Sequence, residues 1–237
     1  MRSTEKNETA EVSGNLGLQQ KTLHRRDFLR YSGYAGVAVA GASLITIASC
    51  RDNDDNNNGV NFGTGDFAIL NYAYALEQLE AAFYQKVIAS PYSGMSALEK
   101  GLLTDVRDHE IAHREFFKAA LGANAIRDLE VDFSSINFSS RDSVLNAAKS
   151  FEDLGVSAYN GAGRYFVDAN YLLLAGKIVS VEARHAAFIR DLLSNGSFAD
   201  SSVIDGNGLD VTRKPREVLG IANKYIVTEL NVNSLPA

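Results

Sequence analysis

Two short stretches of this chain place a glutamate three residues before a histidine: Glu110 with His113, and Glu182 with His185. Residues three apart share one face of a helix, so the carboxylate and the imidazole of each pair can converge on one point. Both pairs lie in segments with helical periodicity, and they account for two of only four histidines. Carboxylates combined with imidazoles favour a redox-active iron or manganese ion over a metal that prefers thiolates.

A further glutamate precedes each pair at a similar distance. Glu77 and Glu152 lie 33 and 30 residues before the glutamate of the pair that follows them. Each is followed seven residues later by a tyrosine, Tyr84 or Tyr159. The chain therefore indicates two copies of one unit, in which a helix with a single glutamate precedes a helix with Glu-x-x-His.

Residues 76–84, which read Leu-Glu-Gln-Leu-Glu-Ala-Ala-Phe-Tyr, and the repeated pattern resemble the exported bacterial branch of the ferritin-like superfamily. The resemblance covers residues 66–194 and implies a bundle that holds two iron or two manganese ions. It implies that Glu77 and Glu152 are terminal carboxylates and that Glu110 and Glu182 bridge the two metals. His113 and His185 would each supply an imidazole to one metal. It also implies that Tyr84 and Tyr159 are hydrogen-bond partners of these ligands.

Other acidic side chains near this pattern are not assigned as ligands. Glu80 competes with Glu77 for the first ligand position, but Glu80 matches a glycine, Gly155, in the second copy. We therefore expect Glu80 to lie on a solvated helix face, and we expect the same of Glu99 and Glu115.

His109 directly precedes Glu110 and matches Val181 in the second copy. We expect it beside a ligand or at the surface rather than on the metal. In many di-iron bundles an aspartate at this position orients a neighbouring imidazole, and such partners contribute about 10- to 100-fold in metal affinity. Neither copy has that aspartate. Another group must therefore orient the imidazoles, or the site is looser than in the active oxidases.

The periodicity predicts an all-α fold with four long helices, at about residues 66–90, 97–121, 141–168 and 171–194. Asp66 is a suitable N-cap for the first helix, and Ser96 with Glu99 forms a capping box for the second. The segment from Ala123 to Ser139 lacks helical periodicity, and its length suits a crossover along a four-helix bundle. A short fifth helix beginning at Pro215 is expected to cover one end of the bundle.

The N-terminal segment has the features of a targeting signal. A pair of arginines at positions 25 and 26, with Phe-Leu shortly after it, resembles a twin-arginine export signal, and Ile47-Ala48-Ser49-Cys50 resembles a bacterial lipobox. We expect processing at Cys50 and lipidation of its thiol, which would anchor the protein to a membrane. The alternative is an N-terminal membrane helix that is retained.

These observations divide the chain into four parts. We expect a signal peptide at residues 1–50 and an acidic disordered tether at residues 51–65. The bundle is expected at residues 66–195, followed by a loop and the short capping helix at residues 196–237. An acidic stretch directly after a lipidated cysteine also resembles a surface-export signal. The predicted location is the bacterial cell envelope, with the domain facing the periplasm or the surface.

Composition limits the partners. The chain of 237 residues has a formal net charge of −6 and no basic stripe, which argues against nucleic acid. Its one cysteine excludes an internal disulfide and a metal site built on cysteines. The expected partners are metal ions and, through Cys50, a membrane. The oligomeric state stays open, a homo-oligomer included.

Two functions follow from different classes of protein. The first is a lipid-anchored di-metal oxidoreductase that acts on peroxide, dioxygen or ferrous iron. The second is a non-catalytic envelope protein that keeps the bundle for binding or structure, with a degenerate metal site. A closed storage cage is disfavoured because a lipid anchor and a tail would obstruct the shell. Metal content and peroxide turnover separate the first two.

Overall fold

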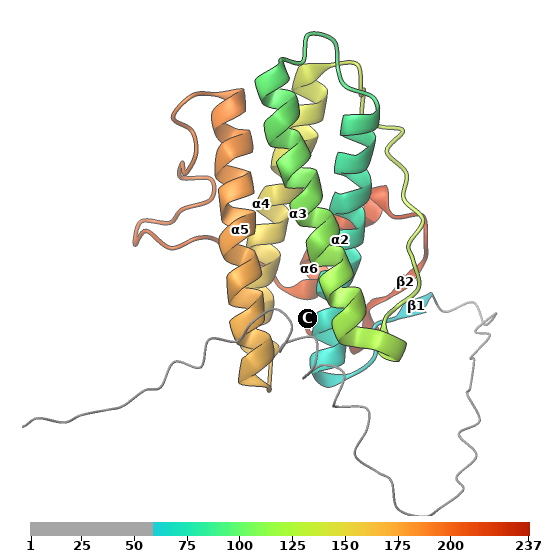
Figure 1. Ribbon diagram of the computed structural model, residues 1–237. Helices are drawn as coiled ribbons and strands as arrows, with labels where there is room; N and C mark the ends of the chain where they lie inside the picture. The colour runs from blue at the N-terminus through green and yellow to red at the C-terminus, as the bar shows by residue number, and fades with distance from the viewer. Residues whose placement is uncertain (1–58) are drawn as a thin grey trace, which may run out of the picture. The chain divides into compact units, whose positions relative to one another are not determined.

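The computed structural model describes residues 59–237, so the predicted signal peptide, Cys50 and most of the tether lie outside the described residues. Four long helices run side by side in Figure 1: α2 (Gly65–Ala89), α3 (Ala97–Leu121), α4 (Arg141–Ala162) and α5 (Ala169–Leu193). Their most extensive contacts join α2 to α3 and α4 to α5. The predicted all-α four-helix bundle is confirmed. Within residues 59–237, no helix combines the length and the apolar character needed to cross a membrane.

Local signals explain most helix ends. Ser96 and Glu99 form the predicted capping box at the start of α3, and α3 ends before Gly122, whose φ of 53° is left-handed. The N-cap of α2 is Thr64, so the expectation for Asp66 is wrong. The Asp66 carboxylate instead accepts hydrogen bonds from the backbone amides of Val167 and Asp168, 2.8 and 2.9 Å away. Asp66 therefore ties α2 to the loop before α5.

Helix α4 is shorter than expected. It stops at Ala162 and passes into one 3-10 turn, Gly163–Tyr165, where the sequence predicted a helix to residue 168. Gly161 and Gly163 weaken this end of α4. Asp168 accepts a hydrogen bond from the backbone amide of Asn170 and so caps the start of α5. The chain must reverse direction between α4 and α5, and these residues supply the break.

The segment between α3 and α4 runs along the length of the bundle, as predicted (Figure 1). In the view shown, α3 ends at the bottom and α4 begins at the top, so only a long connection can join them. Side chains of α2 hold this crossover: the amide of Ile126 donates to Asn71 (2.9 Å), and the amide of Leu129 donates to Gln78 (2.7 Å). Further along, the ring of Phe83 packs edge-on against Phe133.

The C-terminal segment contains the predicted short helix, α6 (Pro215–Ala222), with Pro215 in its first turn. It packs against α4, and the ring of Tyr225 contacts that of Phe151, halfway along α4. The segment therefore covers the side of the bundle, whereas we expected it to cover an end. A short parallel pairing of β1 (Val60–Asn61) with β2 (Leu230–Asn231) joins the two ends of the described chain.

One glycine is required for this docking. At Gly161 on α4, a Cβ atom would lie 1.8 Å from the carbonyl oxygen of Arg213. The same stretch is fixed by the amide of Arg213, which donates to the carbonyl of Ser157 (3.0 Å), and by its guanidinium, which donates to the Ser157 hydroxyl (2.7 Å). Any larger residue at position 161 would displace the segment that precedes α6.

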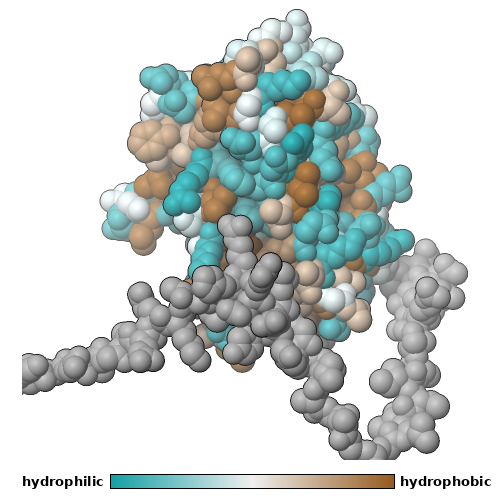
Figure 2. All heavy atoms as spheres, viewed as in Figure 1, coloured by the Kyte–Doolittle hydropathy of each residue, from teal (hydrophilic) through white to brown (hydrophobic). Residues whose placement is uncertain are grey.

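The crossover packs against α2, and α2 is the most deeply buried of the four long helices. Its buried residues run almost without interruption from Ala68 to Tyr84. The face of the molecule in Figure 2 is mostly hydrophilic with scattered apolar residues. A helix that is covered on all sides can hold polar side chains only where they find partners, and the buried glutamates of α2 therefore require an explanation.

Candidate metal centre

The four long helices each bring ligand-type side chains to the middle of the bundle. The four glutamates of the repeated pattern have no exposed surface: Glu77 on α2, Glu110 on α3, Glu152 on α4 and Glu182 on α5. The two imidazoles lie beside them, with side-chain exposures of 13% for His113 and 6% for His185. All six predicted ligand residues therefore meet in one place.

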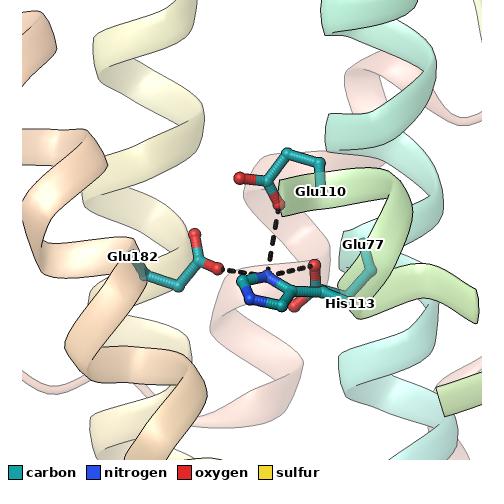
Figure 3. A group of neighbouring side chains, drawn as sticks. All are labelled: Glu77, Glu110, His113 and Glu182. Atoms are coloured by element: carbon teal, nitrogen blue, oxygen red, sulfur yellow. Dashed lines mark ion pairs between the residues drawn. The ribbon is translucent and has the colours of Figure 1, made fainter. Parts of the chain in front are cut away.

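One group of side chains surrounds His113 (Figure 3). The Nδ1 atom of His113 lies 2.8 Å from Glu182 Oε1, 3.4 Å from Glu77 Oε2 and 3.7 Å from Glu110 Oε2. Figure 3 shows these carboxylates arriving from three different helices and pointing toward the imidazole. One ligand atom from each of the four residues lies within 4.8 Å of the others, which is close enough for all four to bind one ion.

A second group surrounds His185 with the same geometry. Its Nδ1 atom lies 2.8 Å from Glu110 Oε1, 3.5 Å from Glu152 Oε2 and 3.6 Å from Glu182 Oε2. These distances match those around His113 when each residue is exchanged for its counterpart in the other half of the repeat. The ligand atoms of this group also lie within 4.8 Å of one another.

Two carboxylates belong to both groups, and these are Glu110 and Glu182. Each directs one oxygen toward His113 and the other toward His185. Glu77 and Glu152 each belong to a single group. The arrangement suits two shared carboxylates and two terminal ones, with one imidazole for each of two ions.

The two tyrosines of the pattern cross between the halves. The hydroxyl of Tyr84 on α2 donates a hydrogen bond to Glu152 Oε1 on α4, and the hydroxyl of Tyr159 on α4 donates to Glu77 Oε1 on α2. The other oxygen of each glutamate is the one that faces an imidazole. Each tyrosine therefore fixes the orientation of a terminal carboxylate that belongs to the opposite half.

The electrostatics of the centre are those of crowded acids and bases. Burial, followed by repulsion from Glu182, raises the pKa values of Glu77 and Glu110. Burial also raises the pKa of Glu152. Burial alone would raise the pKa of Glu182 too, but the two imidazoles beside it outweigh burial and lower that pKa to about 2.

The pKa values of the two imidazoles are also raised, although burial acts on them in the opposite direction. Burial alone would lower the pKa of His113, but the three adjacent carboxylates outweigh it and raise the pKa to about 12. The pKa of His185 is raised for the same reason. Without a metal, the centre therefore keeps protons on its imidazoles to compensate the carboxylates that surround them.

Protons do not satisfy the centre completely. Eight of the eleven buried side-chain atoms without a hydrogen-bond partner of acceptable geometry, counted over residues 59–237, belong to these six residues. They are Glu77 Oε2, both carboxylate oxygens of Glu110, Glu152 Oε2, both carboxylate oxygens of Glu182, and the Nδ1 atoms of His113 and His185. Such atoms are costly to bury, and coordination of cations would satisfy all of them at once. Oxygen and imidazole donors of this kind fit iron or manganese.

Glu80 corrects the sequence analysis. It is buried rather than solvated, and burial, with repulsion from Glu110 and Glu182, holds its pKa well above the ordinary value. A Cβ atom at Gly155 would lie 3.1 Å from Glu80 Oε1, so the missing side chain at Gly155 leaves room for this carboxyl group. The sequence repeat contained a signal for this burial, because Glu80 in one copy aligns with a glycine, Gly155, in the other.

Glu99 is a second correction. Its side chain is 13% exposed and pairs with Arg141 at 2.8 Å, in addition to its part in the capping box. It is a half-buried link between α3 and α4 rather than a freely solvated side chain. Glu115 is exposed, as expected.

His109 lies beside a ligand-type residue. Its Nδ1 atom lies 2.9 Å from His185 Nε2, and the two rings are nearly parallel, with 5.2 Å between their centroids and 9° between their planes. His109 is exposed, and burial, with the nearby His185 and His113, lowers its pKa. The imidazole of His185 thus has carboxylates on its Nδ1 side and a hydrogen-bond partner on its Nε2 side.

A family model described as a ferritin-like domain matches residues 65–195. The matched range begins at the first residue of α2 and extends just past the end of α5, so it contains all six residues of the centre. No curated protein matches the chain.

Proposed function

Because the chain belongs to the ferritin-like domain family, we propose that it is a di-metal protein that binds two iron or two manganese ions in the centre of its bundle. The observation that carries the proposal is the set of eight buried, unsatisfied oxygen and nitrogen atoms that face one another across the centre. The proposed ligands are Glu77, Glu110, His113, Glu152, Glu182 and His185.

We further propose a redox function, on peroxide, dioxygen or ferrous iron. Ions of this kind, held by carboxylates and imidazoles, supply electron-transfer chemistry with oxygen species. The roles of the protein's own groups are more specific. Glu110 and Glu182 each reach both groups of ligands and would fix the separation of the ions, while Tyr84 and Tyr159 would hold the terminal carboxylates in place. The buried surroundings would exclude bulk water from the reaction.

Metal analysis and a turnover assay test the two parts separately. Protein purified from its native envelope should contain about two equivalents of iron or manganese and should consume peroxide or oxidise ferrous iron. A variant with Glu110→Ala and Glu182→Ala should lose both properties. Two bound metals without turnover would exclude the enzyme and leave a metal-binding envelope protein. A protein with neither metal nor affinity for metal would contradict the whole proposal.

Export and lipidation remain part of the proposal and rest on the sequence of residues 1–50. We propose that the mature protein begins at Cys50, with its thiol lipidated, and is held in the cell envelope after export by the twin-arginine route. Mass spectrometry of native material should find a lipidated N-terminal peptide, and Cys50→Ser should release or misprocess the protein. An unmodified N-terminus at Met1 in the envelope would contradict this proposal.

A further inference from the structure

The groups behind the two imidazoles of the centre are not alike. His185 Nε2 has a hydrogen-bond partner 2.9 Å away, the Nδ1 atom of His109 on α3. Among residues 59–237, His113 Nε2 has no hydrogen-bond partner. The residue that matches His109 in the second copy is Val181 on α5, and its side chain cannot accept a hydrogen bond. The two groups of ligand-type residues are therefore equivalent, but only one of the two imidazoles has a hydrogen-bond partner on its Nε2 side.

This difference bears directly on metal binding. An imidazole that binds a metal through Nδ1 must carry its proton on Nε2, and a group that accepts this proton fixes both the tautomer and the ring orientation. The Nδ1 atom of His109 is placed to accept it. At His113 the Nδ1 atom also faces three carboxylates, but only ring packing and water can hold the Nε2 side, because that side chain is 13% exposed.

From this asymmetry we infer that the two metal positions are inequivalent: His109 positions His185, so the metal position at His185 binds tightly, and the position at His113 is the exchangeable one. The inference rests on the proposed di-metal function and deepens it, since it assigns different roles to two similar half-sites. His109 acts as a positioning residue, because it touches His185 and does not reach the ligand atoms of the centre.

The test is a titration with Mn²⁺ of the full chain from which a chelator has removed all metal. Electron paramagnetic resonance measures the concentration of free Mn²⁺ at each step. We expect two Mn²⁺ ions to bind in two steps, with dissociation constants that differ by at least about tenfold. His113→Ala should retain the tight step, and His185→Ala should remove it. Two equal steps in the unchanged protein would overturn the inference while leaving the proposed function intact.

Variants at residues 109 and 181, the two matched positions, test the effect of a hydrogen-bond partner behind each imidazole. His109→Val copies the second half into the first and should weaken only the tight step, by roughly 10- to 100-fold. Val181→His makes the reverse change and should strengthen the weak step. His109→Asn places an amide near the position of Nδ1 and should restore most of the tight binding. Since residue 109 is exposed, the two variants at this position should leave the helical circular dichroism of the protein unaltered.

The outcomes that contradict the inference are specific. Equal weakening of both steps by His109→Val, or no weakening of either, would overturn it. Failure of His109→Asn to recover tight binding in a folded protein would also overturn it, because a hydrogen-bond acceptor is what the inference requires. Absence of binding by the unchanged protein of both Mn²⁺ and, in the same titration, Fe²⁺ would instead contradict the proposed function, and the inference with it.

Discussion

The first helix pair, α2 with α3, and the second, α4 with α5, present nearly the same atoms to the centre of the bundle and place them in different surroundings. The shortest contact between an imidazole and a carboxylate is 2.8 Å in both halves. Each half also sends a tyrosine to the terminal glutamate of the other. The two halves differ in the side chains that surround these carboxylates and imidazoles.

The outer differences are concentrated at two matched positions. Glu80 in the first half stands where the second half has Gly155, and the carboxyl group occupies the space that the glycine leaves. His109 in the first half stands where the second half has Val181, and only His109 forms a hydrogen bond with an imidazole. The repeated set of carboxylates and imidazoles is therefore held by different neighbours in the two halves, and such neighbours affect the affinity of a metal site.

The largest expected effect distinguishes shared ligands from terminal ones. Glu110→Ala or Glu182→Ala should reduce metal content from about two ions to nearly none, because each residue belongs to both groups. Glu77→Ala should mainly remove one ion, since it belongs to one group. Metal analysis by mass spectrometry measures this, with the exposed Glu115→Ala on α3 as the matched control. Retention of two ions in Glu110→Ala would contradict the shared role.

The pH dependence of the metal-free protein is the next largest effect. Glu77, Glu110 and Glu152 have raised pKa values, so their contribution to stability is fully present below the ordinary value of 4.5 and is lost as the pH rises. The pKa of His113 is raised to about 12, so its contribution is lost as the pH rises from 6.5 toward 12. Glu182 has the opposite sign, since its pKa is lowered to about 2 and its contribution is lost as the pH falls below 4.5.

The metal-free protein should therefore lose stability when the pH is raised from about 5 to about 9, and bound metal should reduce that loss because it replaces the protons. Thermal unfolding with and without a chelator measures both curves. Because the pKa of Glu80 is held well above its ordinary value, Glu80→Gln should stabilise the metal-free protein increasingly as the pH rises. A constant effect of Glu80→Gln at all pH values would contradict the raised pKa.

A smaller effect concerns the C-terminal segment, which docks on the second half. Gly161→Ala should destabilise the protein by about 1–3 kcal/mol, because the new Cβ atom would overlap the carbonyl of Arg213. Gly176→Ala on α5, where nothing lies within 4 Å, is the matched control and should stabilise by about 0.5–1 kcal/mol. Denaturant unfolding measures both. Equal effects of the two changes would show that the close approach at Gly161 is absent in solution.

The smallest effect tests the crossed tyrosines. Tyr84→Phe and Tyr159→Phe each remove one hydrogen bond to a buried carboxyl group and should each cost about 1–1.5 kcal/mol of stability. Similar values would support the equivalence of the inner contacts in the two halves. A large cost for one tyrosine and none for the other would show that the asymmetry extends to the inner contacts. Unfolding of the metal-free variants at one pH gives the comparison directly.

The sequence alone determined the four helices, the crossover and the residues that meet at the centre. Helical periodicity, the capping box at Ser96 and the glycine after α3 act over a few residues, so local rules describe them well. The two Glu-x-x-His pairs and their upstream glutamates were informative because helix geometry fixes which side chains share a face. The N-cap of α2 and the end of α4 were placed wrongly, because competing caps there are chosen by contacts with other parts of the chain.

Only the tertiary structure decided the surroundings of the centre. The burial of Glu80 depends on the space left by a glycine on another helix, and the contact of His109 with His185 joins residues 76 positions apart. The docking of the C-terminal segment against the side of α4 likewise brings Tyr225 to Phe151, which is far from it in the sequence. Helical periodicity places a side chain on its own helix, but its exposure and its pKa depend on which other helices and segments pack against it, and no local rule contains that information.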